Sequence, residues 1–535
     1  MPLRLTDIHL YLSEDESALY SKAAAILKIP KDNILDLRIV KKSLDARKKD
    51  RIAFVYTVDV ETQHFASLQK EETGKIRVIE KESHVSFPKL RTELRPVVVG
   101  TGPAGLFAAL RLAEHGVKSL VLERGKEVYR RVKDVEKFWA KRVLDPESNV
   151  QFGEGGAGTF SDGKLTTRVD DPRISYILKA MVDAGAKEEI LYQSKPHIGT
   201  DRLRGVVINL RKRLISLGCE VCFESKVTGF NAHDGKIESI VINKAREIRT
   251  DLLILAIGNS ARDTYEALSK AGVKLENKPF AIGFRVEHPQ RLIDGIQYGK
   301  AAGHPKLPPA EYLLTHNMPH MGRSAYSFCM CPGGSVIAAS SEPGRLVVNG
   351  MSLSKRDSQY ANSALVVTVR PEDFEVFGKG PLAGIEFQRR FEGAAFEAGG
   401  GNYNAPAQGL IDFLYSKKEA SLNSSSYRPA LTSANLEECM PDYVITALRE
   451  AIPQFEKKMR GFISKEAILI GAETRTSAPV RITRGGDFQS VNTTGLYPCG
   501  EGAGYSGGIV SSALDGIRVA DAVIGLHIPK IINLE

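Results

Sequence analysis

The stretch that most constrains this chain is a glycine turn between two short apolar runs, at residues 95–125, which read RPVVVGTGPAGLFAALRLAEHGVKSLVLERG. Pro96–Val99 is long enough for a buried parallel strand, and the Ala- and Leu-rich segment Leu106–His115 has helical spacing. Ser119–Leu122 predicts a second strand, which ends on Glu123. The sequence therefore predicts a strand–turn–helix–strand unit of a parallel sheet.

The glycines of this turn have G-x-G-x-x-G spacing at Gly100, Gly102 and Gly105. Gly100 permits the tight turn, Gly102 lets a pyrophosphate approach the backbone, and Gly105 lets the helix pack against the strand. Free N–H groups at the helix N-terminus favour phosphate, and Glu123 lies where an acid that binds a ribose hydroxyl is expected. A plain glycine-rich turn is the alternative, but the strands, helix and acid in register favour dinucleotide binding.

Composition sets broad limits on the class of protein. The 535 residues are 42% hydrophobic and 26% charged, which is typical of a soluble globular protein with several cores. No apolar run approaches the ~18 residues of a membrane span, and the N-terminus has no signal-peptide core, so we expect a cytoplasmic protein. The net charge of +9 suits anionic small molecules as well as RNA. The six cysteines lack zinc spacing, so we expect no metal site.

Residues 1–92 precede the glycine turn and predict a separate domain. Their expected order of elements is βαββαβ, with the second helix over Gln63–Lys70, which suggests a ferredoxin-like domain. The basic segment Lys41–Arg51 is either a solvated hairpin turn or a docking site for an anion, RNA or a partner. Glu82–Arg95 has the character of a linker.

The rest of the chain predicts one domain interrupted by another. Residues 93–278 and 469–535 carry the glycine turns and form the two parts of a nucleotide-binding domain. Residues 279–468 have short strands, prolines and glycines and no glycine fingerprint, with helices near Leu382–Ala398 and Pro441–Ile452. We interpret 279–468 as an inserted, mainly β, substrate domain.

Three further glycine-rich stretches suggest ligand contacts. Asn149–Arg168 is dense in glycine, and it predicts either a loop folded over a cofactor or a mobile surface loop. Gly258 and Asn259 follow an apolar strand, at the edge where open α/β sheets bind ligands. Cys499–Gly508 reads CGEGAGYSGG and opens a helix whose free N–H groups favour an anionic or carbonyl oxygen.

Together these turns resemble FAD-binding oxidoreductases of the glutathione-reductase and p-hydroxybenzoate-hydroxylase superfamily. The resemblance is closer to bacterial proteins described as uncharacterised FAD-utilising dehydrogenases, and covers nearly the whole chain. It is carried by SLDARKKDRIAFVYTVDV, GEGGAGTFSDGKL, KPHIGTDRL, FCMCPGG, NGMS, ANSALVVTV and ETRTSAPVRITR. The resemblance implies FAD as the cofactor. The expected fold is an α/β, three-layer Rossmann-like domain with the inserted mainly β domain and the N-terminal ferredoxin-like domain.

The resemblance also implies roles for individual residues. Gly100, Gly102 and Gly105 would hold the FAD pyrophosphate, Glu123 the adenosine ribose, and Val227 would lie near the adenine. Glu501 would bind the ribityl or pyrophosphate region, although superfamily members more often have Asp there. The complete set of expected cofactor residues is Gly100, Gly102, Pro103, Ala104, Gly105, Glu123, Arg124, Gly156, Val227, Gly258, Asn259, Gly500, Glu501, Gly507, Gly508 and Ile509. Gly507, Gly508 and Ile509 would face the flavin N1–O2 edge and stabilise negative charge there.

Each candidate catalytic, substrate-binding or redox residue also has an alternative, purely structural role. Lys164 and His197 are the expected catalytic residues. The alternative for Lys164 is a place on a mobile surface loop, and the alternative for His197 is a capping or surface role. Arg475 and Arg481 are expected to bind a substrate carboxylate or phosphate, with an ion pair to Glu473 or other acids as the alternative. Arg285 is expected to line the active-site face of the substrate domain, with Glu287 and His288. Cys329 and Cys331 lack C-x-x-C spacing, so strand packing is favoured over redox activity.

These observations predict an FAD-dependent dehydrogenase or reductase that moves a hydride between flavin N5 and a small organic substrate. The chain lacks a second G-x-G-x-x-G after a strand, so NAD(P)H, if it is the electron donor, must dock transiently. The alternatives are a flavin monooxygenase and an RNA-binding flavoprotein or tRNA modifier, and nucleic acid is retained as an alternative partner. The sequence gives no prediction of the oligomeric state.

Overall fold

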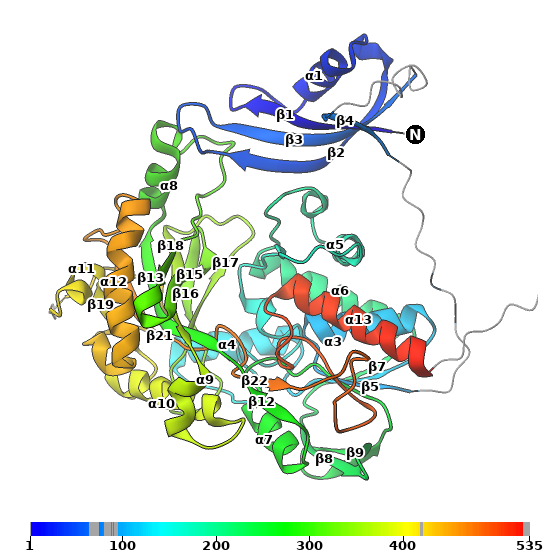
Figure 1. Ribbon diagram of the computed structural model, residues 1–535, viewed down its shortest axis with the longest axis vertical. Coiled ribbons are helices and arrows are strands. Elements are labelled where there is room, and N and C mark those ends of the chain that lie inside the picture. Colours follow the sequence, from blue (N-terminus) through cyan, green and yellow to red (C-terminus); the bar gives the residue numbers. More distant parts are fainter. Residues whose placement is uncertain are drawn as a thin grey trace, which may run out of the picture.

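The computed structural model describes residues 2–63, 74–79, 87, 89, 95–417 and 421–527, and its sheets fall into three groups (Figure 1). We name them the N-terminal domain, the parallel-sheet domain and the antiparallel-sheet domain. In Figure 1 the N-terminal domain lies at the top, the antiparallel-sheet domain at the left and the parallel-sheet domain at the right and below.

The N-terminal domain is a four-stranded antiparallel sheet with one described helix. Its strand order is β2-β3-β1-β4, and alternate side chains of the strands pack under α1 because successive residues of a strand face opposite sides. The helix expected over Gln63–Lys70 and most of the linker expected over Glu82–Arg95 lie outside the described residues, so the ferredoxin-like assignment stays a prediction. The elements are β1 Leu3–Tyr11, α1 Ala18–Leu27, β2 Ile34–Asp45, β3 Ala53–Thr62 and β4 Ile76–Val78.

The basic segment Lys41–Arg51 joins β2 to β3 and lies against the other two domains. The backbone of Lys42 pairs with the parallel-sheet domain: its N–H donates to Tyr192 O at 2.8 Å and its carbonyl accepts from Ser194 N at 2.9 Å. Lys306 Nζ of the antiparallel-sheet domain donates to Asp15 at 2.6 Å. The N-terminal domain therefore spans the boundary between the two larger domains.

The parallel-sheet domain has the Rossmann-like architecture expected of an α/β protein. Its five strands are all parallel, in the order β23-β11-β5-β6-β7, and residues from both ends of the chain share the sheet. In β5, β6, β11 and β23, alternate residues are buried on opposite faces, which explains why these four strands are continuously apolar. The edge strand β7 is less buried and begins at the exposed Glu220. The strands are β5 Val97–Val99, β6 Leu120–Leu122, β7 Glu220–Cys222, β11 Leu253–Leu255 and β23 Leu496–Pro498.

Helices cover one face of this sheet and a small meander covers the other. Val98, Val121 and Ile254 pack against α3, α6 and α13, whereas Val97 and Val99 pack toward the three-stranded meander and α7. Three layers result, as Figure 1 shows. The elements are α3 Pro103–Glu114, α4 Val128–Lys141, α5 Arg173–Asp183, α6 Thr200–Ser216, β8 Val227–His233, β9 Lys236–Ile242, β10 Arg246–Arg249, α7 Arg262–Lys270 and α13 Ile509–His527.

The antiparallel-sheet domain is built on a seven-stranded sheet in the order β14-β15-β18-β13-β21-β19-β20. All neighbours are antiparallel except β19 and β20. β21 is a central strand, so this sheet continues past the predicted boundary at residue 468. The strands are β13 Phe280–Pro289, β14 Thr315–Met318, β15 Arg323–Cys331, β18 Tyr360–Val369, β19 Ala405–Gly409, β20 Leu431–Ser433 and β21 Ile468–Glu473, with a separate hairpin of β16 Gly334–Ala338 and β17 Val348–Ser352.

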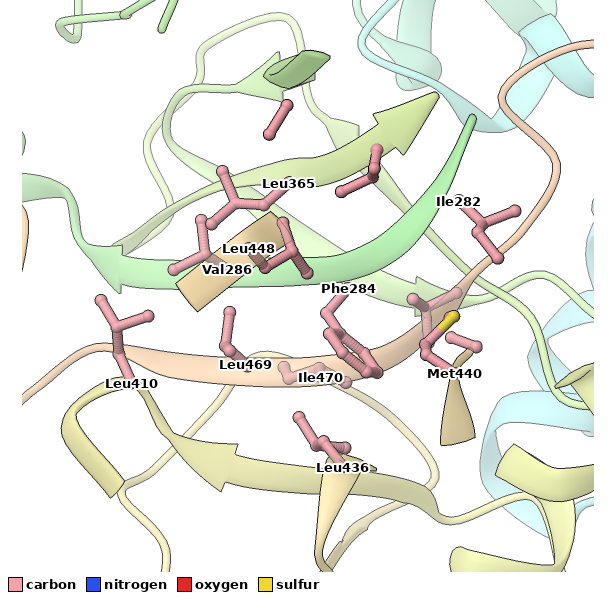
Figure 2. Close-up of a cluster of buried hydrophobic side chains, with 14 of the residues drawn as sticks. Ile282, Phe284, Val286, Leu365, Leu410, Leu436, Met440, Leu448, Leu469 and Ile470 are labelled. Carbon is pink, nitrogen blue, oxygen red and sulfur yellow. The ribbon is translucent and has the colours of Figure 1, made fainter. Parts of the chain in front are cut away.

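The core of this domain lies between the sheet and its helices. Figure 2 shows Phe284 and Val286 of β13 and Ile470 of β21 meeting Leu448 of α12 and Leu436. All five side chains are essentially inaccessible to solvent. The helices are α8 Gln290–Tyr298, α9 Pro371–Phe374, α10 Ala383–Ala398, α11 Leu410–Leu414 and α12 Asp442–Lys458.

Two strands carry the chain between the two larger domains. β12 (Leu275–Asn277), on the way out, pairs antiparallel with β22 (Val480–Ile482), on the way back. The crossing is therefore a two-stranded ribbon, which brings the carboxyl edge of the parallel sheet to face the antiparallel sheet.

Candidate functional site

A cavity of ≈ 1410 Å³ lies between the parallel-sheet domain and the antiparallel-sheet domain. One wall is the carboxyl edge of the parallel sheet, including Gly100, Glu123 and Gly258. The other is formed from β14 and β15, including Tyr326 and Cys329. Ligands of open α/β sheets bind at the carboxyl edge, so this cavity is the candidate site.

The first glycine turn forms the floor of the cavity. Gly100 has a φ of 102°, and a Cβ there would lie 2.2 Å from Ala256 O. A Cβ on Gly105 would lie 1.9 Å from Gly100 O, so Gly105 allows α3 to pack on the turn and does not line the cavity. α3 begins at Pro103 after Gly102, with no side-chain cap, and both residues line the cavity together with Ala104. Uncapped N–H groups at a helix start suit an anion.

Glu123, at the end of β6, binds backbone groups on three segments. One carboxylate oxygen accepts from Thr101 N at 2.9 Å and from its hydroxyl at 2.6 Å. The other accepts from Gly125 N at 3.0 Å and Gly153 N at 3.1 Å. This side chain therefore ties the first turn to the glycine-rich loop, and its role toward a ribose stays a prediction.

Beyond Glu123 the cavity continues over Arg124 and Val227. The Arg124 guanidinium lies 3.8 Å from the centre of the Phe152 ring and is paired with Asp263 and Glu147. These contacts fix a flat cationic surface at this end of the cavity, where the adenine is expected.

The glycine-rich loop after α4 packs directly onto the first turn. Gly156 lines the cavity, has a φ of 63°, and a Cβ there would lie 3.1 Å from the Cα of Gly102. A Cβ on Gly158 would lie 3.3 Å from Ile509. The loop therefore bridges the two helix starts, at Pro103 and Ile509, and its role over a cofactor stays a prediction.

The turns at 255–259 and 499–508 meet each other in the cavity. Asn259 Nδ2 donates to Glu501 Oε1 at 2.8 Å, and the Gly500 N–H donates to Asp515 at 2.7 Å behind them. Burial raises the pKa of Glu501 to about 7, against the opposing effects of the Asn259 hydrogen bond and the Lys278 charge. Glu501 therefore lies near the midpoint of its titration at neutral pH.

The start of α13 completes this side of the cavity. Gly507, Gly508 and Ile509 all line it, whereas Gly500 packs against Ala104, where a Cβ would lie 2.7 Å from the alanine Cβ. The predicted cofactor residues thus come together around one continuous space, apart from Gly105 and Gly500, which lie behind its wall.

The two expected catalytic residues are neighbours with different access. Lys164 lines the cavity, its Nζ donates to Met330 O, and it lies 3.9 Å from Glu311. His197 pairs with it through the backbone, but its ring is turned to Ser354 O at 3.2 Å and does not line the cavity. Burial and then the nearby Arg356 lower the pKa of His197, so this ring is neutral at pH 7.

The three expected substrate arginines differ in position. Arg475 lines the cavity, and its guanidinium is paired with Glu392 at 2.9 Å. Arg285 is fully buried behind the wall and bound to Glu473 at 2.7 Å. Arg481 is on β22, with its guanidinium 5.3 Å from the Tyr505 ring centre, and does not line the cavity. Of the three, the structure brings Arg475 to the site.

Other cavity residues carry no motif that the sequence could reveal. Arg356 lines the cavity and forms a buried ion pair with Asp162 of the glycine-rich loop. Glu311 is held by Lys195 and Lys164, and the charge of these lysines lowers its pKa. These residues come from separate segments, so spacing along the chain gives no signal for their meeting.

Within the described residues, every helix is too short or too polar to cross a membrane.

Comparisons with known proteins follow the same division of the chain. Residues 93–135 match the model of an FAD binding domain, and residues 279–476 match that of the "FAD-dependent protein, C-terminal domain-like" family. Residues 2–61 match a domain of unknown function. The first match covers the glycine turn and Glu123, and the second covers the antiparallel-sheet domain, so each side of the cavity contains a segment that matches a family of FAD-dependent proteins.

Among solved structures, a flavin-dependent brominase, Bmp2, aligns with 80% of this chain and 79% of its own at 12% identity, with a TM-score of 0.37. An L-amino acid deaminase from Proteus myxofaciens aligns with 84% of this chain and 92% of its own at 11% identity, with a TM-score of 0.33. Likeness at this level supports no conclusion about function.

The alignments with two sequence relatives cover very different shares of this chain. A thiamine thiazole synthase of Saccharolobus islandicus is 27% identical over 34% of this chain and 70% of its own length. A protein of Clostridium beijerinckii, described as uncharacterized, is 50% identical over 98% of this chain and 99% of its own. The chain therefore belongs to the same family as the Clostridium beijerinckii protein, and it is an FAD-dependent protein.

Proposed function

We propose that this chain is an oxidoreductase of the dehydrogenase or reductase type, in which FAD exchanges a hydride with an organic substrate held between the two larger domains. The observation that carries the proposal is the single continuous cavity. It reaches from Glu123, across Gly100 and Glu501, to Tyr326 and Cys329 of the other domain. Its volume of ≈ 1410 Å³ exceeds the about 300–1,000 Å³ of an ordinary small-molecule site, which leaves room for a second molecule beside a dinucleotide.

The first turn and the loop beside it fit the pyrophosphate of FAD. Gly102 and Gly156 present backbone to the cavity without a Cβ, and the uncapped start of α3 supplies N–H donors. The start of α13 at Gly507–Ile509 offers a second set of donors to a carbonyl edge. Bound FAD supplies the hydride chemistry, and the protein residues bind, orient and exclude water.

The substrate end of the cavity has groups that can hold a proton or a charge. Lys164, Lys195 and Glu311 form one charged group there, and Glu501 lies on the cofactor side. With its pKa near neutrality, Glu501 is suited to hold or release a proton. Lys164 and Glu501 are therefore the residues that we assign to catalysis within this proposal.

Anaerobic stopped-flow absorbance of the purified protein tests the proposal. We expect a yellow protein whose oxidised flavin band bleaches with NADH, NADPH or the substrate. Bleaching by a nicotinamide identifies the donor, and re-oxidation by organic acceptors identifies a reductase. A colourless protein that does not take up added FAD contradicts the proposal.

Two further measurements separate the alternatives: aerobic NAD(P)H oxidation and RNA binding at increasing salt. Oxidation of NAD(P)H that accelerates only when an organic substrate and oxygen are both present identifies a monooxygenase. RNA binding that weakens steeply with salt would favour an RNA-modifying enzyme. In the basic segment, Lys42 is paired with Glu16 and Arg47 with Asp45, which reduces the positive charge that these two residues could offer to RNA.

A further inference from the structure

Strand β15 is interrupted where it reaches the cavity. It pairs regularly with β18 as far as Phe328 opposite Ala364, and resumes at Cys331 opposite Asn362. The extra residue makes a bulge at Cys329 and Met330, and Cys329 has a φ of 47°, in the left-handed region that only about a few per cent of non-glycine residues adopt. Bulges of this kind re-aim side chains and often lie beside active sites.

Two cations from different domains hold this bulge. Arg285 Nη1 donates to the carbonyl of Cys329 at 3.2 Å, and Lys164 Nζ donates to the carbonyl of Met330. Arg285 is fully buried and fixed by Glu473 at 2.7 and 2.9 Å. Lys164 comes from the glycine-rich loop of the parallel-sheet domain. Hydrogen bonds from Arg285 and Lys164 therefore fix the backbone of the bulge at the domain boundary, and both donors are positively charged.

The two thiols of the bulge have different exposure. Cys329 lines the cavity and is partly accessible, whereas Cys331 is fully buried with its Sγ 3.4 Å from the Cys329 carbonyl oxygen. The interaction with the Cys331 thiol, and then the charges of Arg285 and Lys164, lower the pKa of Cys329. The interaction with Cys329 raises the pKa of Cys331. The pair therefore loses its first proton at Cys329, which leaves a thiolate beside a thiol.

Cys329 lies in the same cavity as residues of the cofactor side. Cys329 and Glu501 line the same space, and the negative charge of Cys329 contributes to the raised pKa of Glu501. The other cysteine lining the cavity, Cys499, is fully buried, and burial raises its pKa. Cys329 is therefore the accessible, activated thiol of this cavity among the described residues.

We propose that Cys329 and Cys331 form a redox-active dithiol that exchanges two electrons with the FAD bound in the same cavity. On oxidation the Cys329 thiolate and the Cys331 thiol form a sulfur–sulfur bond and release two electrons and one proton. The flavin accepts both electrons and that proton, so the charge balances, and the reverse step reduces the disulfide. The inference rests on the proposed function, since it requires bound FAD.

A reductive titration of the yellow protein tests the inference. The air-oxidised protein is titrated anaerobically with dithionite, and the flavin absorbance reports the electrons taken up. We expect about four electrons per flavin, two for the flavin and two for the disulfide. Cys329→Ser and Cys331→Ser should each take up about two, whereas the matched control Cys222→Ser, in β7 away from the cavity, should take up about four.

A thiol count on the unmodified protein gives a second readout that needs no variant. In the oxidised protein, unfolded anaerobically, two of the six cysteines should no longer react, and mass spectrometry should find Cys329 linked to Cys331. A yellow protein that takes up about two electrons and keeps all six thiols overturns this inference and leaves the proposed function standing. A protein that binds no FAD overturns both.

Discussion

The two walls of the cavity are built from different materials. The parallel-sheet wall is largely backbone: the turns at 100–105, 255–259 and 499–508 bring chain close to chain at glycines. The antiparallel-sheet wall is made of side chains, supplied by β14, β15 and the segments near Glu311 and Arg356. The parallel-sheet wall requires glycine at fixed positions, because its backbone segments approach each other closely. The antiparallel-sheet wall requires only that side chains from distant parts of the sequence come together in the fold.

This difference predicts that the two walls fail in different ways. A side chain added to the backbone wall should prevent the turn from forming and remove the cofactor. A charge removed from the side-chain wall or from the network behind it should cost free energy of unfolding but leave the cofactor turn intact.

The largest effect is expected for Gly100→Ala. The added Cβ would clash with Ala256 O at 2.2 Å, and the backbone φ of 102° is one that alanine rarely adopts. We expect a loss of more than about 4 kcal/mol in the free energy of unfolding and a cofactor content below about one tenth. Urea unfolding and the visible absorbance spectrum measure the two quantities.

The matched control for Gly100→Ala is Gly205→Ala. Gly205 is exposed in α6, and a Cβ there meets nothing within 4 Å. This change should stabilise the protein by roughly 0.5–1 kcal/mol, because alanine is the better helix former. Equal FAD content in the two variants would contradict the claim that close backbone packing at Gly100 is required for cofactor binding.

Arg262→Met should have the next largest effect. Arg262, at the start of α7, is fully buried and bound to Glu392 of α10 at 2.6 and 2.9 Å, across the domain boundary. Removing it leaves Glu392 with fewer partners, and breaking such a buried pair costs about 3–5 kcal/mol. Urea unfolding at pH 7 measures the loss, with FAD retained at saturating cofactor.

The control for this variant is Lys179→Met, which breaks an exposed pair with Asp183 on α5. Its cost should be below about 0.5 kcal/mol, as for other surface pairs one helical turn apart. Similar costs for the two variants would show that the buried network contributes no more than a surface pair.

Glu501→Gln should remove a dependence of stability on pH in the protein stripped of FAD. The folded carboxyl has a pKa of about 7, against an ordinary value of 4.5, so the native state keeps a proton that the unfolded chain releases. The free energy of unfolding therefore falls as the pH rises from 4.5 to about 7, by at most about 3 kcal/mol from this group. Urea unfolding at pH 5 and pH 7.5 should show a smaller fall for Glu501→Gln than for the unmodified protein.

Lys164→Met should have the smallest effect, on the reactivity of Cys329. The Lys164 charge helps to lower the pKa of that thiol, so in the reduced protein its removal should slow alkylation of Cys329 by iodoacetamide at pH 6.5 roughly threefold. Lys195→Met is the matched control, because Lys195 contacts the same Glu311 and is not among the main groups that shift the pKa of Cys329. Equal alkylation rates in both variants would contradict the claim that the Lys164 charge lowers the pKa of Cys329.

The sequence by itself determined the parallel-sheet domain and its dinucleotide-binding turns, and the resemblance to FAD-binding oxidoreductases implied FAD as the cofactor. A tight turn that lets helix and strand touch requires glycine at Gly100 and Gly105, and strands buried on both faces must be continuously apolar, so local residue types report the structure. The same locality made the turns at Gly258 and Glu501 recognisable, and it placed helices close to the observed α10 and α12.

Only the tertiary structure decided which side chains share the cavity. Arg285 and Arg475 are both substrate-site candidates in the sequence, yet Arg285 is buried behind the wall with Glu473 and Arg475 lines the cavity. Cys329 is distinguished from a packing cysteine by a bulge and by Lys164, which lies 166 positions from Met330 along the chain. Such meetings depend on how sheets and loops pack, and the free energy of packing is spread over a whole domain, so no short stretch of sequence records it.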